Sequence, residues 1–374
     1  MSSVQAAKRT RKPLGWKRIV GYVISIAIVV AIFVWAIPKF ADYRDVWAAI
    51  KTLTPIETWS LVAATIFNLV TYWLANQAAL PGLGIGKAAV LTQTTTSVAN
   101  TLPAGGAIAI GMTYEILDSW GFSGTSVALY VGVTGIWNIF TKLGLPLLAL
   151  VFLALSGHLT TTYILAAIFG IIVLGVAIGL FTLVFRSEAI AIKIGNWLGR
   201  VVSSFRRLVH KAPVTTWGDG AARFRRDTIV LVEHRWLRLS LMTVLSQVAL
   251  FLVLLLSLRH LGVSEQEVST AEAFAVYAFS RLLSAVPITP GGVGLIDLGY
   301  IGGLTAFSGE EKAAIVAAVL LFRALTYGIQ IPIGGLTYVV WRVKSDWRRP
   351  ADAAAQRERA GYFALSDGSA RVAE

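Results

Sequence analysis

The chain alternates between long apolar runs and short polar connections. A membrane-spanning α-helix needs about 20 consecutive residues that are mostly apolar. Six runs come close to this length or exceed it, at residues 19–37, 59–80, 126–155, 160–185, 237–258 and 313–341. The pattern therefore predicts an all-α, polytopic membrane protein with about six full spanning helices.

Two further apolar stretches, 88–118 and 271–307, contain too many helix-breaking residues to form one continuous helix each. Proline lacks an amide donor and glycine adds backbone freedom. Irregular backbone survives at membrane depth only where protein or a water-filled cavity satisfies it. Each stretch is therefore predicted to form two half-helices, although a tight turn at the outer surface is an alternative for the second. The breaks contain Asn100, Pro103, Gly105 and Gly106 in the first stretch, and Pro290, Gly291 and Gly292 in the second.

The distribution of lysine and arginine predicts how the chain is oriented in the membrane. Residues 1–18 hold six basic and no acidic residues, and residues 186–236 hold ten basic and four acidic ones. Residues 342–374 hold seven basic and five acidic residues, whereas residues 38–58 hold three of each. Because cytoplasmic loops carry the excess of basic residues, the N-terminus, the middle loop and the C-terminal tail are predicted to be cytoplasmic.

This orientation places the two broken stretches on opposite sides of the membrane. Residues 88–118 must begin and end at the cytoplasmic face, and residues 271–307 must begin and end at the outer face. We therefore expect two opposed re-entrant hairpins, an arrangement typical of transporters built from inverted repeats. A closely paired even number of crossings is the alternative for residues 88–118. The resemblance between the two Pro-Gly breaks is compatible with such a repeat.

The same pattern suggests a division of the chain into segments. We expect a basic cytoplasmic N-terminus (1–18), a transmembrane domain (19–342) and a disordered cytoplasmic tail (343–374). Within the loop 186–236, apolar residues recur at spacings of three and four, as at Ile190, Ile194 and Trp197. This spacing predicts an amphipathic helix lying on the anionic inner leaflet, or alternatively a helix that packs on the loop itself.

Three basic residues, Lys142, Arg281 and Arg323, lie within predicted spans or the second broken stretch, and the acidic Asp297 directly follows the second break. A charge at the centre of a bilayer costs about 2.5–3.5 kcal/mol on insertion scales, so these residues are candidates for a functional site. Arginine suits a lipid phosphate because its guanidinium donates two parallel hydrogen bonds. Asp297 would serve as counter-charge or proton carrier. Ion pairing of Asp297 with either arginine is the structural alternative, and Lys142 has the further option of reaching an interface.

Composition narrows the function further. The net charge is +13, but the basic residues follow the positive-inside pattern, so nucleic acid is not needed to explain them. The chain has no cysteine, and its four histidines are spread along the sequence without metal-ligand spacing. We therefore expect no enzymatic activity, no metal and no cofactor.

Three segments of the sequence resemble a known family. Residues 286–297 read Val-Pro-Ile-Thr-Pro-Gly-Gly-Val-Gly-Leu-Ile-Asp, which is similar to the P-x-x-P-G-G-x-G-x-x-E run of the lysylphosphatidylglycerol synthase transmembrane-region family, the flippase-like membrane proteins. Asp297 stands where the family usually has Glu. The helix around Arg323 and the first break, 100–106, also resemble family motifs. A basic residue often follows the tyrosine of the first motif, whereas this chain has Glu115 after Tyr114.

The resemblance covers roughly residues 20–342 and implies a membrane region that flips a lipid, without the soluble aminoacyl-transferase domain. From it we expect a flippase-like protein of the prokaryotic plasma membrane that binds and translocates an anionic or polyprenyl-phosphate-linked lipid. The expected substrate-binding residues are the four charged residues above, the residues of both breaks, and Glu115. A homo-oligomer is compatible with this interpretation. The alternative function is a non-transporting scaffold or accessory subunit of a lipid- or glycan-modifying enzyme.

Overall fold

The structure is a computed structural model that describes residues 42–102, 105–156, 161–208, 217–284, 290–308 and 312–344. These residues form helices joined by short turns, and no strand occurs among them. The predicted first span, 19–37, lies outside the described residues, as do the N-terminal segment 1–18 and the tail from residue 345. The protein is an all-α, polytopic membrane protein, as its hydrophobicity pattern predicts.

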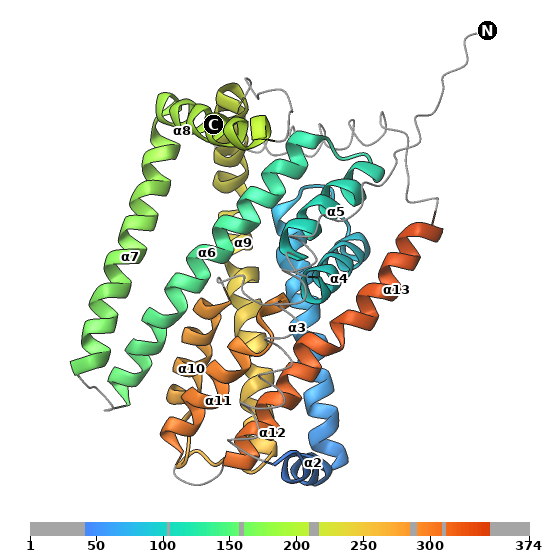
Figure 1. Ribbon diagram of the computed structural model, residues 1–374, viewed down its shortest axis with the longest axis vertical. Helices are drawn as coiled ribbons and strands as arrows, with labels where there is room; N and C mark the ends of the chain where they lie inside the picture. Colours follow the sequence, from blue (N-terminus) through green and yellow to red (C-terminus); the bar gives the residue numbers. More distant parts are fainter. Residues whose placement is uncertain are drawn as a thin grey trace, which may run out of the picture.

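Four described helices are long and apolar enough to cross a membrane. They are α3 (Pro55–Ala79), α6 (Gly124–Leu155), α9 (Trp217–His260) and the continuous run of α12 (Lys312–Arg323), η4 (Ala324–Gly328) and α13 (Gln330–Val343). The predicted span at 160–185 corresponds to α7 (Thr161–Arg186), which meets α8 (Glu188–Leu208) at a bend of 105°. Figure 1 shows α8 lying across the end of the bundle opposite the short helix α2 (Tyr43–Lys51).

Helix α9 begins 20 residues before the predicted start at 237, in a region predicted to be a loop. An apolar run predicts only the part of a helix that can lie in hydrocarbon. Arg, Glu and Ala also have high helix propensity, so the helix can continue beyond the apolar run. The extension is held by α8, which packs along it, and by Leu231, which is fully buried. The Arg225 Nε atom also donates a hydrogen bond to the Phe185 carbonyl oxygen at 2.8 Å.

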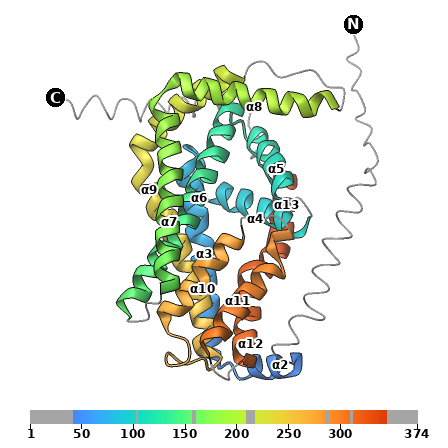
Figure 2. The ribbon, with the colours of Figure 1, turned by 60° about the vertical axis from the view of Figure 1, so that its left-hand side comes forward.

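The two broken stretches form helical hairpins at opposite ends of the bundle. The first consists of α4 (Ile85–Thr101) and α5 (Gly105–Ser119), in the half nearest α8. The second consists of α10 (Thr270–Leu283), the 3₁₀ turn η3 (Pro290–Gly292) and α11 (Leu295–Phe307), in the half nearest α2 (Figure 2). Among the described residues the two hairpins thus occupy opposite halves of the helix bundle, which is the arrangement that two opposed re-entrant elements would have.

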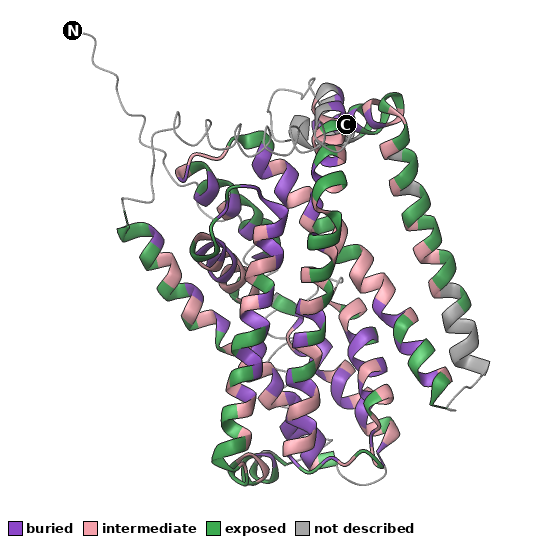
Figure 3. Ribbon diagram, turned by 180° about the vertical axis from the view of Figure 1, so that it is seen from behind, coloured by how far each residue is buried: buried purple, intermediate pink, exposed green. Residues whose placement is uncertain are grey.

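Each hairpin has an apolar core of its own. One cluster of buried residues joins α10, α11 and α12 to the adjacent parts of α6 and α9. The other joins α5 and the start of α6 to α3, α4 and Trp341 of α13. Figure 3 shows these buried residues on the inner faces of the helices, whereas most residues shown on α7 are exposed. The polar residues of the bundle interior therefore gather between two apolar layers.

Helix α13 packs very closely on α4 at Gly334. A Cβ atom at this glycine would lie 2.2 Å from the Ser97 Cβ atom and 2.4 Å from the Gln93 carbonyl oxygen. The missing side chain therefore lets the last spanning helix contact the backbone of the first hairpin directly.

We predict that Gly334→Leu destabilises the protein by about 1–3 kcal/mol, because overpacking a close helix contact forces the backbones apart. The midpoint of thermal unfolding in detergent measures the effect. Gly335→Leu is the matched control, because a Cβ at this neighbouring glycine meets nothing within 4 Å. Equal midpoints for the two variants would contradict the predicted packing.

Candidate functional site

A polar pocket of about 200 Å³ lies where the two hairpins approach each other. Its walls come from both hairpins and from α3, α6, α9, α12, η4 and α13. A polar surface inside an apolar bundle is costly unless its groups find partners, so this pocket is the natural candidate for a site. The polar side chains that line it are Asn68, Tyr72, Thr96, Asn100, Asn138, Ser246, Gln247, Ser280, Arg281, Ser284, Tyr300, Arg323, Thr326, Tyr327 and Gln330.

Asp297 lies beside this pocket, in the first turn of α11. Its side chain is buried, with the residue 1% exposed, and its Oδ2 atom accepts a hydrogen bond from the Gly294 amide at 2.7 Å. Gly294 has a φ of 87°, in the left-handed region that glycine adopts at little cost. The carboxylate therefore caps the start of α11, where the helix dipole also favours a negative charge.

Asp297 also forms a buried ion pair with Arg323. The Arg323 Nε atom lies 2.6 Å from the Asp297 Oδ1 atom, and both side chains are largely shielded from solvent. Arg323 is the last residue of α12 and is followed by the π-helical turn η4. Such turns inside α-helices are frequent at functional sites. Of the two arginines considered as partners for Asp297, the structure selects Arg323.

Tyr327, one turn after Arg323, connects the two hairpins. Its ring lies under the Arg323 guanidinium, 4.4 Å from the Cζ atom to the ring centroid. Its hydroxyl donates a hydrogen bond to the Asn100 carbonyl oxygen at 2.5 Å, near the end of α4. A Cβ atom at Gly291 would lie 2.3 Å from this ring, so the turn of the second hairpin also contacts it directly. Sequence reasoning assigned Tyr327 no role, although its position four residues after Arg323 places both on one helical face.

Arg281 has no such carboxylate partner. It lies in the last turn of α10 and lines the pocket. Its Nε atom is buried without a hydrogen-bond partner, and its guanidinium pairs with no acidic side chain in the described part of the chain. Tyr72 and Tyr300 line the same pocket, as does Arg323. The described pocket lining therefore offers Arg281 polar neutral groups and a second cation, but no carboxylate.

Lys142 on α6 is a further cation near the pocket. It is half-buried and lies one helical turn after Asn138, which lines the pocket. No described acidic side chain forms an ion pair with it. Together with Arg281, Arg323 and Asp297, it makes a region of three cations and one carboxylate. Such a region attracts an anion.

The other predicted site residues divide into three groups, of which the first two lie at the pocket or in the hairpin turns. Asn100 and Gly291 line the pocket. Gly105 and Gly292 are close-packed in the hairpin turns. A Cβ atom at Gly105 would lie 2.5 Å from the Val98 carbonyl oxygen, and one at Gly292 would lie 2.2 Å from the Ile296 Cδ1 atom. Close packing therefore explains why these two positions have no side chain.

The remaining predicted residues do not come together at the pocket lining. Glu115 lies on α5, exposed, with a carboxylate oxygen 3.9 Å from an Arg342 guanidinium nitrogen. Gly106 is exposed and outside the lining. Pro290 begins η3, and Pro103 lies outside the described residues. Glu115 is therefore placed as an interhelical partner of α13.

Several uncharged polar residues of the pocket were not predicted as site residues. The Asn68 amide donates to the Ser246 carbonyl oxygen at 3.1 Å, and the Tyr277 hydroxyl donates to Gln247 Oε1 at 2.9 Å. These contacts join α3 and α10 to α9. The signal that could have found them is the occurrence of Asn and Gln inside otherwise apolar spans, because such residues face the bundle interior.

The fold and the pocket define a class of protein: a polytopic membrane protein in which two opposed re-entrant hairpins enclose a charged pocket. The family model of the lysylphosphatidylglycerol synthase TM region matches residues 22–334, and the chain belongs to this family. The family is the membrane-embedded, non-catalytic part of these synthases. A comparison with curated proteins finds no match.

We predict that Asp297→Ala destabilises the protein by about 3–5 kcal/mol, because it leaves the buried Arg323 charge uncompensated. Asp297→Asn should cost less, since its amide oxygen can still accept from the Gly294 amide. Thermal unfolding of Asp297→Ala, Arg323→Leu and the double variant forms a double-mutant cycle that isolates the pair. Strictly additive changes would show that the two side chains are not coupled.

Proposed function

We propose that this protein binds the anionic headgroup of a membrane lipid in the pocket between its hairpins and translocates that lipid across the membrane. The substrate would be an anionic phospholipid or a polyprenyl-phosphate-linked lipid. The observation that carries the proposal is Arg281, a cation at the pocket wall without a carboxylate partner among the described residues. A phosphate would supply the missing negative charge and accept charge-assisted hydrogen bonds.

The unsatisfied polar atoms around the pocket support a polar ligand. The Arg281 Nε, Arg323 Nη2 and Gln330 Oε1 atoms are buried and lack hydrogen-bond partners in the described structure. Leaving such groups unpaired costs about 1–3 kcal/mol each, and more for charged groups. A headgroup with both donors and acceptors would satisfy all three.

The opposed hairpins support movement of the ligand between leaflets. The pocket lies at the junction of an element that enters from one end of the bundle and an element that enters from the other. In transporters with this arrangement, one element moves against the other around a fixed site near the midplane. Tyr327 and the Asp297–Arg323 pair are the contacts that such a movement would rearrange.

We propose in addition that the protein lies in a prokaryotic plasma membrane with both termini in the cytoplasm. The support is the excess of basic residues in segments 1–18, 186–236 and 342–374. The sharp bend between α7 and α8 supports the placement of α8 on the anionic inner leaflet.

We predict that Arg281→Gln lowers the rate of lipid movement about tenfold or more. A hydrogen bond to a charged group contributes about 1.5–3 kcal/mol, and 1.4 kcal/mol corresponds to a factor of about ten. The measurement is the transfer of fluorescent phosphatidylglycerol and of a fluorescent polyprenyl phosphate between leaflets of proteoliposomes. Arg44→Gln, on the exposed face of α2, is the matched control and should leave the rate unchanged.

Two outcomes of this experiment would oppose the proposal. If wild-type protein moves both lipids no faster than protein-free liposomes do, the proposed transport function is wrong. If Arg281→Gln retains full activity, the pocket does not take part in transport. A third outcome would favour an accessory role. In that case, variants in α8 would abolish function in cells, whereas Arg281→Gln and Asp297→Asn would leave it unchanged.

We predict that single cysteines at or just before the starts of the two hairpins, α4 and α10, are labelled from opposite sides of the membrane. The chain has no native cysteine, so every label reports the introduced one. Gln266→Cys, in the exposed turn before α10, should react with a membrane-impermeant maleimide in intact cells. Gly86→Cys, at the start of α4, should react only after permeabilisation, and a Cβ there meets nothing within 4 Å. Labelling of both in intact cells would contradict the orientation.

A further inference from the structure

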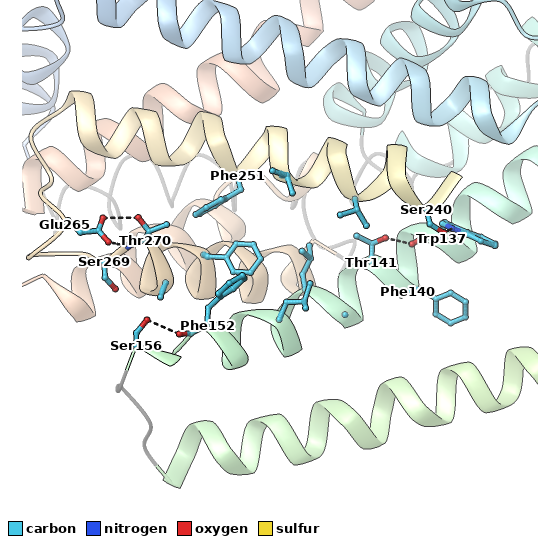
Figure 4. Close-up of a pocket in the computed structure, with 17 residues that line it drawn as sticks. Trp137, Phe140, Thr141, Phe152, Ser156, Ser240, Phe251, Glu265, Ser269 and Thr270 are labelled. Carbon is cyan, nitrogen blue, oxygen red and sulfur yellow. Dashed lines mark hydrogen bonds between the residues drawn. The ribbon is translucent and has the colours of Figure 1, made fainter. Parts of the chain in front are cut away.

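A second and larger cavity, of about 880 Å³, lies between α6, α9 and α10. We call it the side groove; its lining residues are shown in Figure 4. Its walls are mainly apolar, with Phe152 and Phe251 of α6 and α9 packed against Phe274 of α10 at centroid distances of 5.6 and 5.0 Å. Cavities of about 300–1,000 Å³ are typical of binding sites for small organic ligands.

The side groove opens laterally, towards the surroundings of the bundle. Leu148, Phe152 and Val248 line it and are 52, 50 and 51% exposed, respectively. In a membrane-spanning bundle these half-exposed apolar residues face hydrocarbon rather than water. A lipid chain can therefore enter the groove from the bilayer without crossing a polar layer.

The groove is long enough to hold a lipid chain. Along α6 the lining runs from Trp137 to Ser156, which is about 28 Å at 1.5 Å per residue. This exceeds the share of one leaflet, about half of a hydrocarbon thickness of about 30 Å. Polar groups occur at both ends. At one end Trp137 Nε1 donates to Ser240 Oγ at 2.9 Å, and at the other the Thr270 hydroxyl donates to Glu265 at 2.9 Å.

Two cations that lack carboxylate partners in the described chain lie on helices that form the groove. Lys142 lies on α6 between Thr141 and Gly144, which both line the groove. Arg281 lies seven residues after Phe274 on α10, about 10 Å further along nearly the same helical face. Like charges repel, so a single phosphate between these two cations would replace a repulsion with two attractions.

We propose that the side groove holds the hydrocarbon chain of a phospholipid whose phosphate is bound by Arg281 and Lys142. The protein would then recognise its substrate by the chain and the phosphate together. This inference rests on the proposed function for the phosphate, and it adds a separate site for the chain. It makes α6, α9 and α10 the elements that select the lipid.

Gly144 provides a direct test, because it lines the groove and a Cβ atom there meets nothing within 4 Å. Gly144→Trp should fill the groove and weaken binding of dioleoyl phosphatidylglycerol to the purified protein by at least about tenfold, since the chain loses its burial. Gly135→Trp is the matched control: this α6 glycine is exposed, has no atom within 4 Å of its Cβ and does not line the groove. Native mass spectrometry measures the binding, and equal affinities of the two variants would overturn the proposal.

A second measurement needs no substitution. Phosphatidylglycerol with a photoreactive diazirine in its acyl chain is irradiated with the wild-type protein, and the modified peptides are identified. Adducts on the groove-lining segments of α6, α9 or α10 are expected. Adducts found only elsewhere would overturn the proposal and indicate that α7 or a second copy of the chain covers the groove.

The two proposals can fail separately. If Gly144→Trp weakens lipid binding but wild-type protein moves no lipid between leaflets, the groove assignment stands and the transport function fails. If wild-type protein moves lipid and both Gly144→Trp and Gly135→Trp bind and move it equally well, the groove assignment fails and the transport function stands.

Discussion

The buried ion pair between Asp297 and Arg323 holds together the part of the molecule where continuous helices are not possible. A carboxylate inside an apolar bundle is tolerated only when a cation and hydrogen-bond donors compensate it. Asp297 obtains both, from Arg323 and from the Gly294 amide. The Pro-Gly turn of the second hairpin, the start of α11 and the π-helical turn after α12 thereby become one unit. Tyr327 extends this unit to the first hairpin through Asn100.

This arrangement explains why polar and apolar residues are separated into layers. Each hairpin packs into its own apolar cluster, near opposite ends of the bundle. The backbone breaks and the charged residues are left between these clusters, where they can satisfy one another. A rigid spanning bundle would not need such a layer. The proposed binding of a polar headgroup at membrane depth would require one.

Charge balance distinguishes the two parts of this polar layer. The Asp297–Arg323 pair is electrically neutral and contributes to the structure, whereas Arg281 and Lys142 have no carboxylate partner among the described residues. Neutral pairs and unbalanced cations therefore have different expected roles. Substitution of the neutral pair should mainly change stability, whereas substitution of the cations should mainly change the lipid binding that we propose. The lateral opening of the groove connects the second part to the hydrocarbon of the bilayer.

The sequence by itself determined the helical class, the apolar parts of the described spans and the two breaks, because these depend on local hydrophobicity and on the backbone chemistry of proline and glycine. Loop charges likewise predicted that the hairpins are opposed. The tertiary structure decided which arginine pairs with Asp297, that Tyr327 contacts Asn100 and that Glu115 lies outside the pocket lining. It also decided that α9 extends back to Trp217 and that a groove lies between α6, α9 and α10. Spans that are apolar on all sides carry little information about which face meets which neighbour, so packing sets these contacts.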